Sequence, residues 1–194
     1  MKTRATITMV LFFVLIMNAS GQPFNERWSY ELSLGPSVSI GDLSGADVNV
    51  GGGFEAIFHY QLMPHATAYV GWGWNHFKAD QSFAGDDTDF EETGYVLGLQ
   101  FKHPIGKSPL SYYARVGALH NHIELEDGGD IIGDTGHGLG WQLAGGLDIP
   151  VGKAWHLTPG VKFHTLSRTL DFNESKYDLD LKYLSLRVGI TRKF

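Results

Sequence analysis

Apolar and polar residues alternate one by one along most of this chain, beginning at Trp28. Successive side chains of a β-strand point to opposite faces of the sheet, so a period of two predicts strands with one apolar and one polar face. The pattern is plainest over residues 28–40 and recurs in seven further segments, at about residues 50–62, 66–77, 91–102, 110–123, 138–149, 155–169 and 177–194. We therefore expect an all-β fold of eight strands, with a β-bulge near Tyr183 and Leu184, where the phase of the last segment slips.

Connections of two different lengths join these segments. Residues 63–65, 103–109 and 150–154 form short turns, whereas residues 79–90 and 124–137 are longer and polar. Alternating short turns and long loops are typical of an antiparallel up-and-down barrel with both chain ends on the same side. A chain of 194 residues fits one such domain.

The first 21 residues have the composition of a secretory signal peptide. Lys2 and Arg4 precede a short apolar run over residues 7–17, and small residues at 19–21 offer a cleavage site before Gln22. The run is shorter than the roughly 20 residues that a membrane-spanning helix needs. We expect a signal peptide at 1–21 and a barrel domain at 22–194; an uncleaved membrane anchor is the alternative.

Charge and cysteine content exclude several classes of function. Removing two basic residues with the signal peptide leaves 13 basic against 21 acidic residues, so a nucleic-acid partner, which needs a clustered basic surface, is not expected. The chain has no cysteine. Disulfides, thiolate metal sites, cysteine nucleophiles and acylation of an N-terminal cysteine are therefore excluded.

The direction of the apolar face distinguishes two kinds of barrel. A soluble carrier such as a lipocalin turns this face inward, whereas a membrane barrel turns it toward lipid. The polar face here is rich in Gly, Ser and Gln, which suits a narrow lumen filled by side chains. The apolar stretches of about 9–11 residues match a tilted strand that crosses a bilayer. We therefore expect an eight-stranded antiparallel transmembrane β-barrel, with a lipocalin-like carrier as the alternative.

Large aromatic residues of the apolar face gather at strand ends beside the short turns. Aromatic rings are favoured where hydrocarbon meets lipid headgroups, so these residues predict an interfacial girdle. Its members are Trp28, Tyr30, Tyr60, Phe101, Tyr112 and Trp155.

The last strand carries the most specific motif, because its apolar residues alternate up to a terminal Phe. With this ending and its eight segments, the chain resembles the small OmpA/OmpX-type outer-membrane barrels over its whole mature length. The resemblance implies a bacterial outer-membrane location and recognition by the barrel-assembly machinery. The residues that would form the assembly signal are Leu186, Val188, Ile190 and Phe194. Arg192 departs from the pattern, since it falls on the apolar face, where a charge near the interface costs only about 0–1 kcal/mol.

Charged residues of both signs fall on the polar face. Isolated charges could not persist in a narrow lumen, so we expect ion pairs that fill the barrel interior. A narrow pore or proton path is the alternative interpretation. The predicted network comprises Glu31, Glu55, His59, Glu92, Lys102, Arg115, Asp148, Lys162, His164 and Arg187.

Three weaker motifs do not define a site, and we expect no cofactor and no metal. The acidic connections at 86–92 and 124–134 could bind Ca²⁺ but lack EF-hand spacing. His120 and His122 lie on the same strand face, and His137 follows in the next connection. Such a histidine pair can bind a transition metal, but the sequence does not place a third ligand beside it. His164, Ser167 and Glu174 suggest a lipid A deacylase set, as found in some small barrels. The spacing of three puts His164 and Ser167 on opposite strand faces, which leaves the serine without a base.

These observations favour a non-enzymatic barrel with a structural or surface-interaction, adhesin-like role. A small-solute pore and a lipid A-modifying enzyme are the alternatives. The expected partners are outer-membrane lipid and lipopolysaccharide, the assembly machinery during insertion, and an extracellular ligand bound through the loops.

Overall fold

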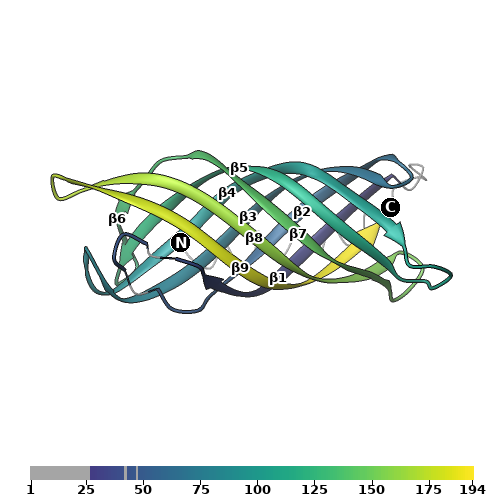
Figure 1. Cartoon of the computed structure of the whole chain (residues 1–194), viewed down its shortest axis with the longest axis horizontal. Helices are drawn as coiled ribbons and strands as arrows, with labels where there is room; N and C mark the ends of the chain where they lie inside the picture. Colours follow the sequence, from purple (N-terminus) through teal and green to yellow (C-terminus); the bar gives the residue numbers. More distant parts are fainter. Residues whose placement is uncertain (1–26, 42, 47) are drawn as a thin grey trace, which may run out of the picture.

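The computed structural model describes residues 27–41, 43–46 and 48–194, so the expected signal peptide lies outside the described residues. No helix among these residues is both long and apolar enough to cross a membrane. The described part of the chain is built from strands (Figure 1). They are β1 (Trp28–Ser39), β2 (Gly51–Met63), β3 (Ala66–Ser82), β4 (Gly85–Pro104), β5 (Ser111–Asp127), β6 (Asp130–Asp134), β7 (Gly138–Pro150), β8 (Trp155–Phe172) and β9 (Ser175–Lys193).

Eight of these strands form a closed antiparallel ring. Each pairs with its neighbour in the chain, β5 passes directly to β7, and β1 pairs with β9 to close the barrel. The short β6 pairs with the end of β5 alone and extends a hairpin. The prediction of an eight-stranded up-and-down barrel is confirmed, and closure leaves no strand edge unpaired in the membrane.

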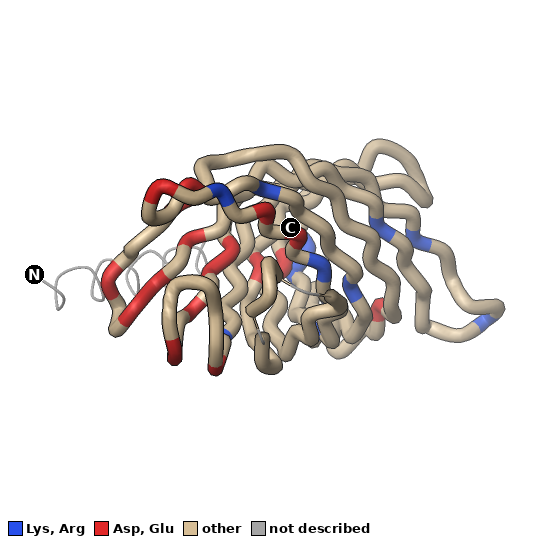
Figure 2. Tube along the Cα trace, turned by 60° about the vertical axis from the view of Figure 1, so that its left-hand side comes forward, with Lys and Arg blue, Asp and Glu red and all other residues tan. Residues whose placement is uncertain are grey.

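The two mouths of the barrel differ. The mouth that holds both ends of the described barrel, where the Phe194 N–H donates to the Trp28 carbonyl at 3.0 Å, has short turns; we call it the terminal mouth. Long hairpins extend from the other, the hairpin mouth, at the left of Figure 1. Most of the acidic segments gather toward that end (Figure 2).

Much of the chain expected to form long polar loops instead continues as strand. β3 and β4 stay paired up to Ser82 and Gly85, and β8 and β9 up to Phe172 and Ser175. The latter hairpin turns through Asn173 and Glu174, whose φ angles of 47° and 63° suit a tight two-residue hairpin turn. The barrel wall therefore continues well past the segments predicted from apolar alternation.

Apolar side chains point outward over the middle and the terminal end of the barrel. The exposed fractions are 67% for Leu34, 65% for Leu97 and 64% for Leu186. Inward positions of the same strands hold Ser33, Gly98 and Ser185. This orientation confirms the transmembrane arrangement and contradicts the lipocalin-like alternative, which would bury the same leucines.

Glycine allows one large side chain to lie across the narrow lumen. Tyr69 of β3 is 2% exposed. A Cβ at Gly98 or Gly117 would collide with the Tyr69 hydroxyl. These two glycines on β4 and β5 therefore make room for the ring.

The predicted bulge at Tyr183 is wrong. β9 keeps one register with β1 and with β8 throughout, and its inward positions run without interruption through Leu179, Leu181, Tyr183, Ser185 and Arg187. The apparent slip is instead a reversal of polarity: toward the hairpin mouth the inward residues are apolar and the outward ones polar.

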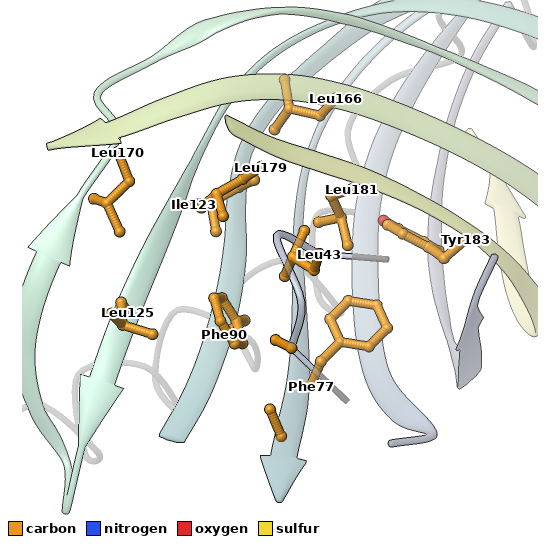
Figure 3. Close-up of a cluster of buried hydrophobic side chains, with 12 residues drawn as sticks. Leu43, Phe77, Phe90, Ile123, Leu125, Leu166, Leu170, Leu179, Leu181 and Tyr183 are labelled. Carbon is orange, nitrogen blue, oxygen red and sulfur yellow. The ribbon is translucent and has the colours of Figure 1, made fainter. Parts of the chain in front are cut away.

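This reversal creates an apolar plug inside the hairpin end of the barrel (Figure 3). Part of the β1–β2 connection contributes to it, because Leu43 and Ala46 turn inward and are 1% and 6% exposed. The plug consists of Leu43, Ala46, Phe77, Ala79, Phe90, Ile123, Leu125, Leu166, Leu170, Leu179, Leu181 and Tyr183.

Outward residues at the level of the plug are charged, as in Lys78, Asp80, Asp178, Asp180 and Lys182. An apolar interior with a charged exterior is the arrangement of a barrel in water. The hairpin end therefore extends beyond the lipid.

Candidate functional site

A bidentate ion pair crosses the lumen between β1 and β5. The Arg115 guanidinium donates to both oxygens of Glu31, with Nη1–Oε1 at 3.0 Å and Nη2–Oε2 at 2.6 Å. Its Nε donates to Gln100 Oε1 at 2.6 Å, and the Thr191 hydroxyl donates to Glu31 Oε2 at 3.0 Å. His59 Nε2 lies 3.5 Å from the same carboxylate. Both charges thus have several partners, as burial of an ion pair requires.

A second ion pair lies deeper in the lumen. Lys162 Nζ lies 3.3 Å from Glu55 Oε2, and both side chains are 6% exposed. Gln142 Nε2 donates to the other oxygen of Glu55 at 3.4 Å. This pair connects β2 to β8 across the barrel.

Glu92 forms the layer next to the plug. Asn75 Nδ2 and the Tyr183 hydroxyl each donate to its Oε2 at 3.0 Å, and His164 Nε2 lies 3.3 Å from its Oε1. Asn121 donates to the same Oε1. The neutral donors keep this carboxylate satisfied.

Arg187 extends the network toward β1. Its guanidinium donates to Asn75 Oδ1 and, at 3.4 Å, to the Ser37 hydroxyl. The structure thus brings most of the predicted lumen charges into three adjoining layers.

Lys102 and Asp148 lie apart from these layers, near the terminal mouth. Lys102 Nζ is 3.2 Å from Asp148 Oδ2, and His156 Nδ1 is 2.6 Å from Asp148 Oδ1. They line a cavity of about 490 Å³ that opens at this mouth and reaches Glu31 and Arg115. Between Glu55 and Glu92, a cavity of about 10 Å³ provides space for about one water molecule. The lumen is therefore open at the terminal mouth and filled from the first ion pair to the plug.

Sequence reasoning missed the neutral partners of these charges. Asn75, Gln100, Asn121 and Gln142 lie on the predicted polar face, but the pattern does not show which charge each one contacts. It also missed the plug, although the alternation of leucine with acidic residues at 178–181 carried the signal.

The aromatic residues predicted as a girdle point outward near the terminal mouth. Ring centroids lie 4.8 Å apart for Trp28 and Tyr60, 6.3 Å for Tyr30 and Trp155, and 6.2 Å for Phe101 and Tyr112. The Arg192 guanidinium lies 5.4 Å from the Trp155 ring centroid, an arrangement that places the charge beside the aromatic belt.

A second outward aromatic group, which was not predicted, lies closer to the hairpin mouth. Trp72, Tyr95 and Trp141 are 37%, 58% and 47% exposed. Trp74 Nε1 donates to Glu91 Oε2 at 2.8 Å, which connects the aromatic level to the charged exterior. The two groups bracket the apolar belt, as expected for two membrane interfaces.

The predicted assembly-signal residues lie on the closing strand β9, with Phe194 directly after its end. Leu186, Val188 and Ile190 point outward and are 64%, 54% and 43% exposed, and the Phe194 ring lies 6.1 Å from Tyr30.

The deacylase-like residues do not converge. His164 faces the lumen and stacks on Tyr183, whereas Ser167 is exposed on the outer surface and Glu174 lies in the hairpin turn. Ser167 therefore has no contact with His164, as the strand spacing predicted.

No protein-family model matches the chain, and no curated protein has a significantly similar sequence. Several solved structures match its fold. The Neisserial surface protein A has 14% identity and a TM-score of 0.64, with 88% of this chain and 98% of that chain covered. OprG from Pseudomonas aeruginosa has 14% identity and a TM-score of 0.57, with 87% and 96% covered. AlkL, determined in lipid bilayers, has 17% identity and a TM-score of 0.57, with 91% and 94% covered.

The chain has the fold of the small eight-stranded outer-membrane barrels. Its outward apolar belt, bracketed by aromatic residues, requires a lipid environment. Fold and belt together show a barrel that spans a membrane.

Proposed function

We propose that this chain is a closed, non-enzymatic surface barrel that acts through its long hairpins. The observation that supports this proposal is the filling of the lumen at two levels. Ion pairs occupy the middle, and the apolar plug lies between them and the hairpin mouth. A solute that enters the cavity at the terminal mouth would have to break both to cross the barrel.

The hairpins provide the surface for an outside partner. They extend beyond the apolar belt and carry acidic residues such as Asp89, Glu126, Asp130 and Asp178. An acidic surface attracts a partner with a basic patch, in a salt-dependent way. Lipid and lipopolysaccharide surround the belt below, and Phe194 with the outward residues of β9 would be read by the assembly machinery.

Conductance in planar bilayers tests whether the lumen is closed. The refolded barrel should show no steady channel. A matched variant with a hollowed plug, Phe77→Ala with Phe90→Ala, should also show no steady channel, because the ion pairs in the middle of the lumen remain in place. A steady open channel in the unaltered protein would contradict the proposal and favour the small-solute pore.

Vesicles test whether the hairpins bind a basic partner. Vesicles that contain the barrel should bind lysozyme, a basic protein, more than empty vesicles do, and should not bind acidic α-lactalbumin. Neutralising Asp89, Glu126, Asp130 and Asp178 to amides should remove the difference. Equal lysozyme binding by vesicles with and without the barrel would contradict the adhesive role.

A further inference from the structure

Three histidines from separate positions meet on the outer surface beside the β5–β6 hairpin. His120 and His122 project outward from β5, and His137 lies in the connection that leads into β7. The His137 ring stacks on His122 with centroids 4.2 Å apart and planes at 16°, and its centroid is 5.1 Å from that of His120. Sequence spacing alone left His120 and His122 without a placed third ligand.

Two carboxylates complete the cluster. His122 Nδ1 lies 2.9 Å from Asp134 Oδ1 and 3.7 Å from Glu124 Oε1. Ligand atoms of these three residues all lie within 4.8 Å of one another. Two ligands of one tetrahedral ion with bonds of about 2.0–2.1 Å are separated by roughly 3.3 Å, so the spacing suits Zn²⁺.

The chain around Asp134 is held in place by its neighbours. The Gly136 N–H donates to Asp134 Oδ1 at 2.7 Å, and the φ of Gly136 is 63°. The Ile123 N–H donates to the Thr135 hydroxyl at 2.9 Å, and Arg168 of β8 donates to the Thr135 carbonyl at 3.0 Å. These contacts fix the backbone that carries Asp134.

The local charges favour the deprotonated groups that a metal needs. Slight burial and the nearby His122 and His120 lower the pKa of His137. Burial raises the pKa of Asp134, but the hydrogen bonds from His122 and the Gly136 N–H outweigh it, so the pKa is lowered.

We propose that His122, Glu124 and Asp134 bind a divalent transition metal ion of the Zn²⁺ class, with the ring of His137 stacked on His122 beside the ion. Mixed imidazole and carboxylate donors favour such an ion over Ca²⁺ or Mg²⁺, which take oxygen ligands. The ion takes the position between His122 Nδ1 and Asp134, and a neutral His122 then carries its single proton on Nε2. The site faces the outside, beyond the apolar belt, and its existence does not depend on the proposed adhesive function.

Calorimetric titration of the refolded, untagged full chain with ZnCl₂ tests this site. One ion should bind per chain with a saturable heat. His122→Gln and Asp134→Asn should each weaken binding at least tenfold. His103→Gln is the matched control, since His103 pairs with His65 at the opposite mouth at a ring distance of 4.7 Å; its binding should be unchanged.

Heat-modifiable gel mobility should show that every variant is folded. The site is overturned if folded protein gives no saturable heat. It is also overturned if His122→Gln and Asp134→Asn bind as tightly as the unaltered chain, or if His103→Gln alone removes binding.

Discussion

Replacing Arg115 by methionine should strongly destabilise the barrel, because Glu31 would remain buried without its bidentate partner. Glu31 and Arg115 are 3% and 8% exposed and lie on strands that do not neighbour each other. Removing one member of a buried pair costs about 3–5 kcal/mol. The Thr191 hydroxyl, at 3.0 Å, and His59, at 3.5 Å, provide only part of the lost interaction.

The double variant Glu31→Leu with Arg115→Met should lose less stability than either single variant, because no unpaired charge is left. Denaturant unfolding of the refolded protein, followed by tryptophan fluorescence, gives the unfolding free energies. Additive losses from the two substitutions would refute the reasoning, since they would show that the two charges do not interact.

Three other substitutions test separate parts of the account. Leu97→Arg should lower the unfolding free energy by about 2–4 kcal/mol if the side chain lies in the bilayer, whereas Asp180→Arg should change it by about 0–1 kcal/mol; equal effects in vesicle unfolding would contradict the belt. Phe90→Ala should cost about 3–5 kcal/mol through the cavity left in the plug, and a negligible loss in the same measurement would show that the plug is loosely packed. Phe194→Ala should lower the amount of barrel assembled in the outer membrane more than it lowers the stability of refolded protein; unchanged assembly in fractionated membranes would remove its role as a signal.

The barrel could be predicted from the sequence because its apolar belt follows a local rule. Leu34, Leu97 and Leu186 each alternate with small or polar residues, and a period of two needs no knowledge of distant contacts. Closure followed from the lack of water in the bilayer, where an open edge is not tolerated.

The hairpin end could not be predicted by the same rule, because its outer surface faces water, whereas the outer surface of the belt faces lipid. Leu179 and Leu181 alternate with Asp178 and Asp180 as regularly as the belt does, but with the apolar residues inward. The charged outward residues therefore gave these segments the sequence pattern of polar loops. The reversal of polarity along β9 gave the pattern of a β-bulge.

The partners within the lumen and at the histidine cluster were also beyond sequence reasoning. Glu31 and Arg115 are 84 residues apart, and their meeting depends on the stagger of all the strands between them. His137 reaches His122 only because Gly136 adopts a positive φ and Thr135 binds the backbone of Ile123. Neither condition leaves a periodic signal.

The reversal of polarity along β9 is tested most directly by two single-cysteine variants, since the chain has no cysteine of its own. Leu186→Cys and Asp180→Cys place a nitroxide label at two outward positions of the same strand. In vesicles, dissolved oxygen should relax the label at 186 more strongly, and a water-soluble nickel chelate should relax the label at 180 more strongly. Equal access of the chelate to both labels would contradict the account.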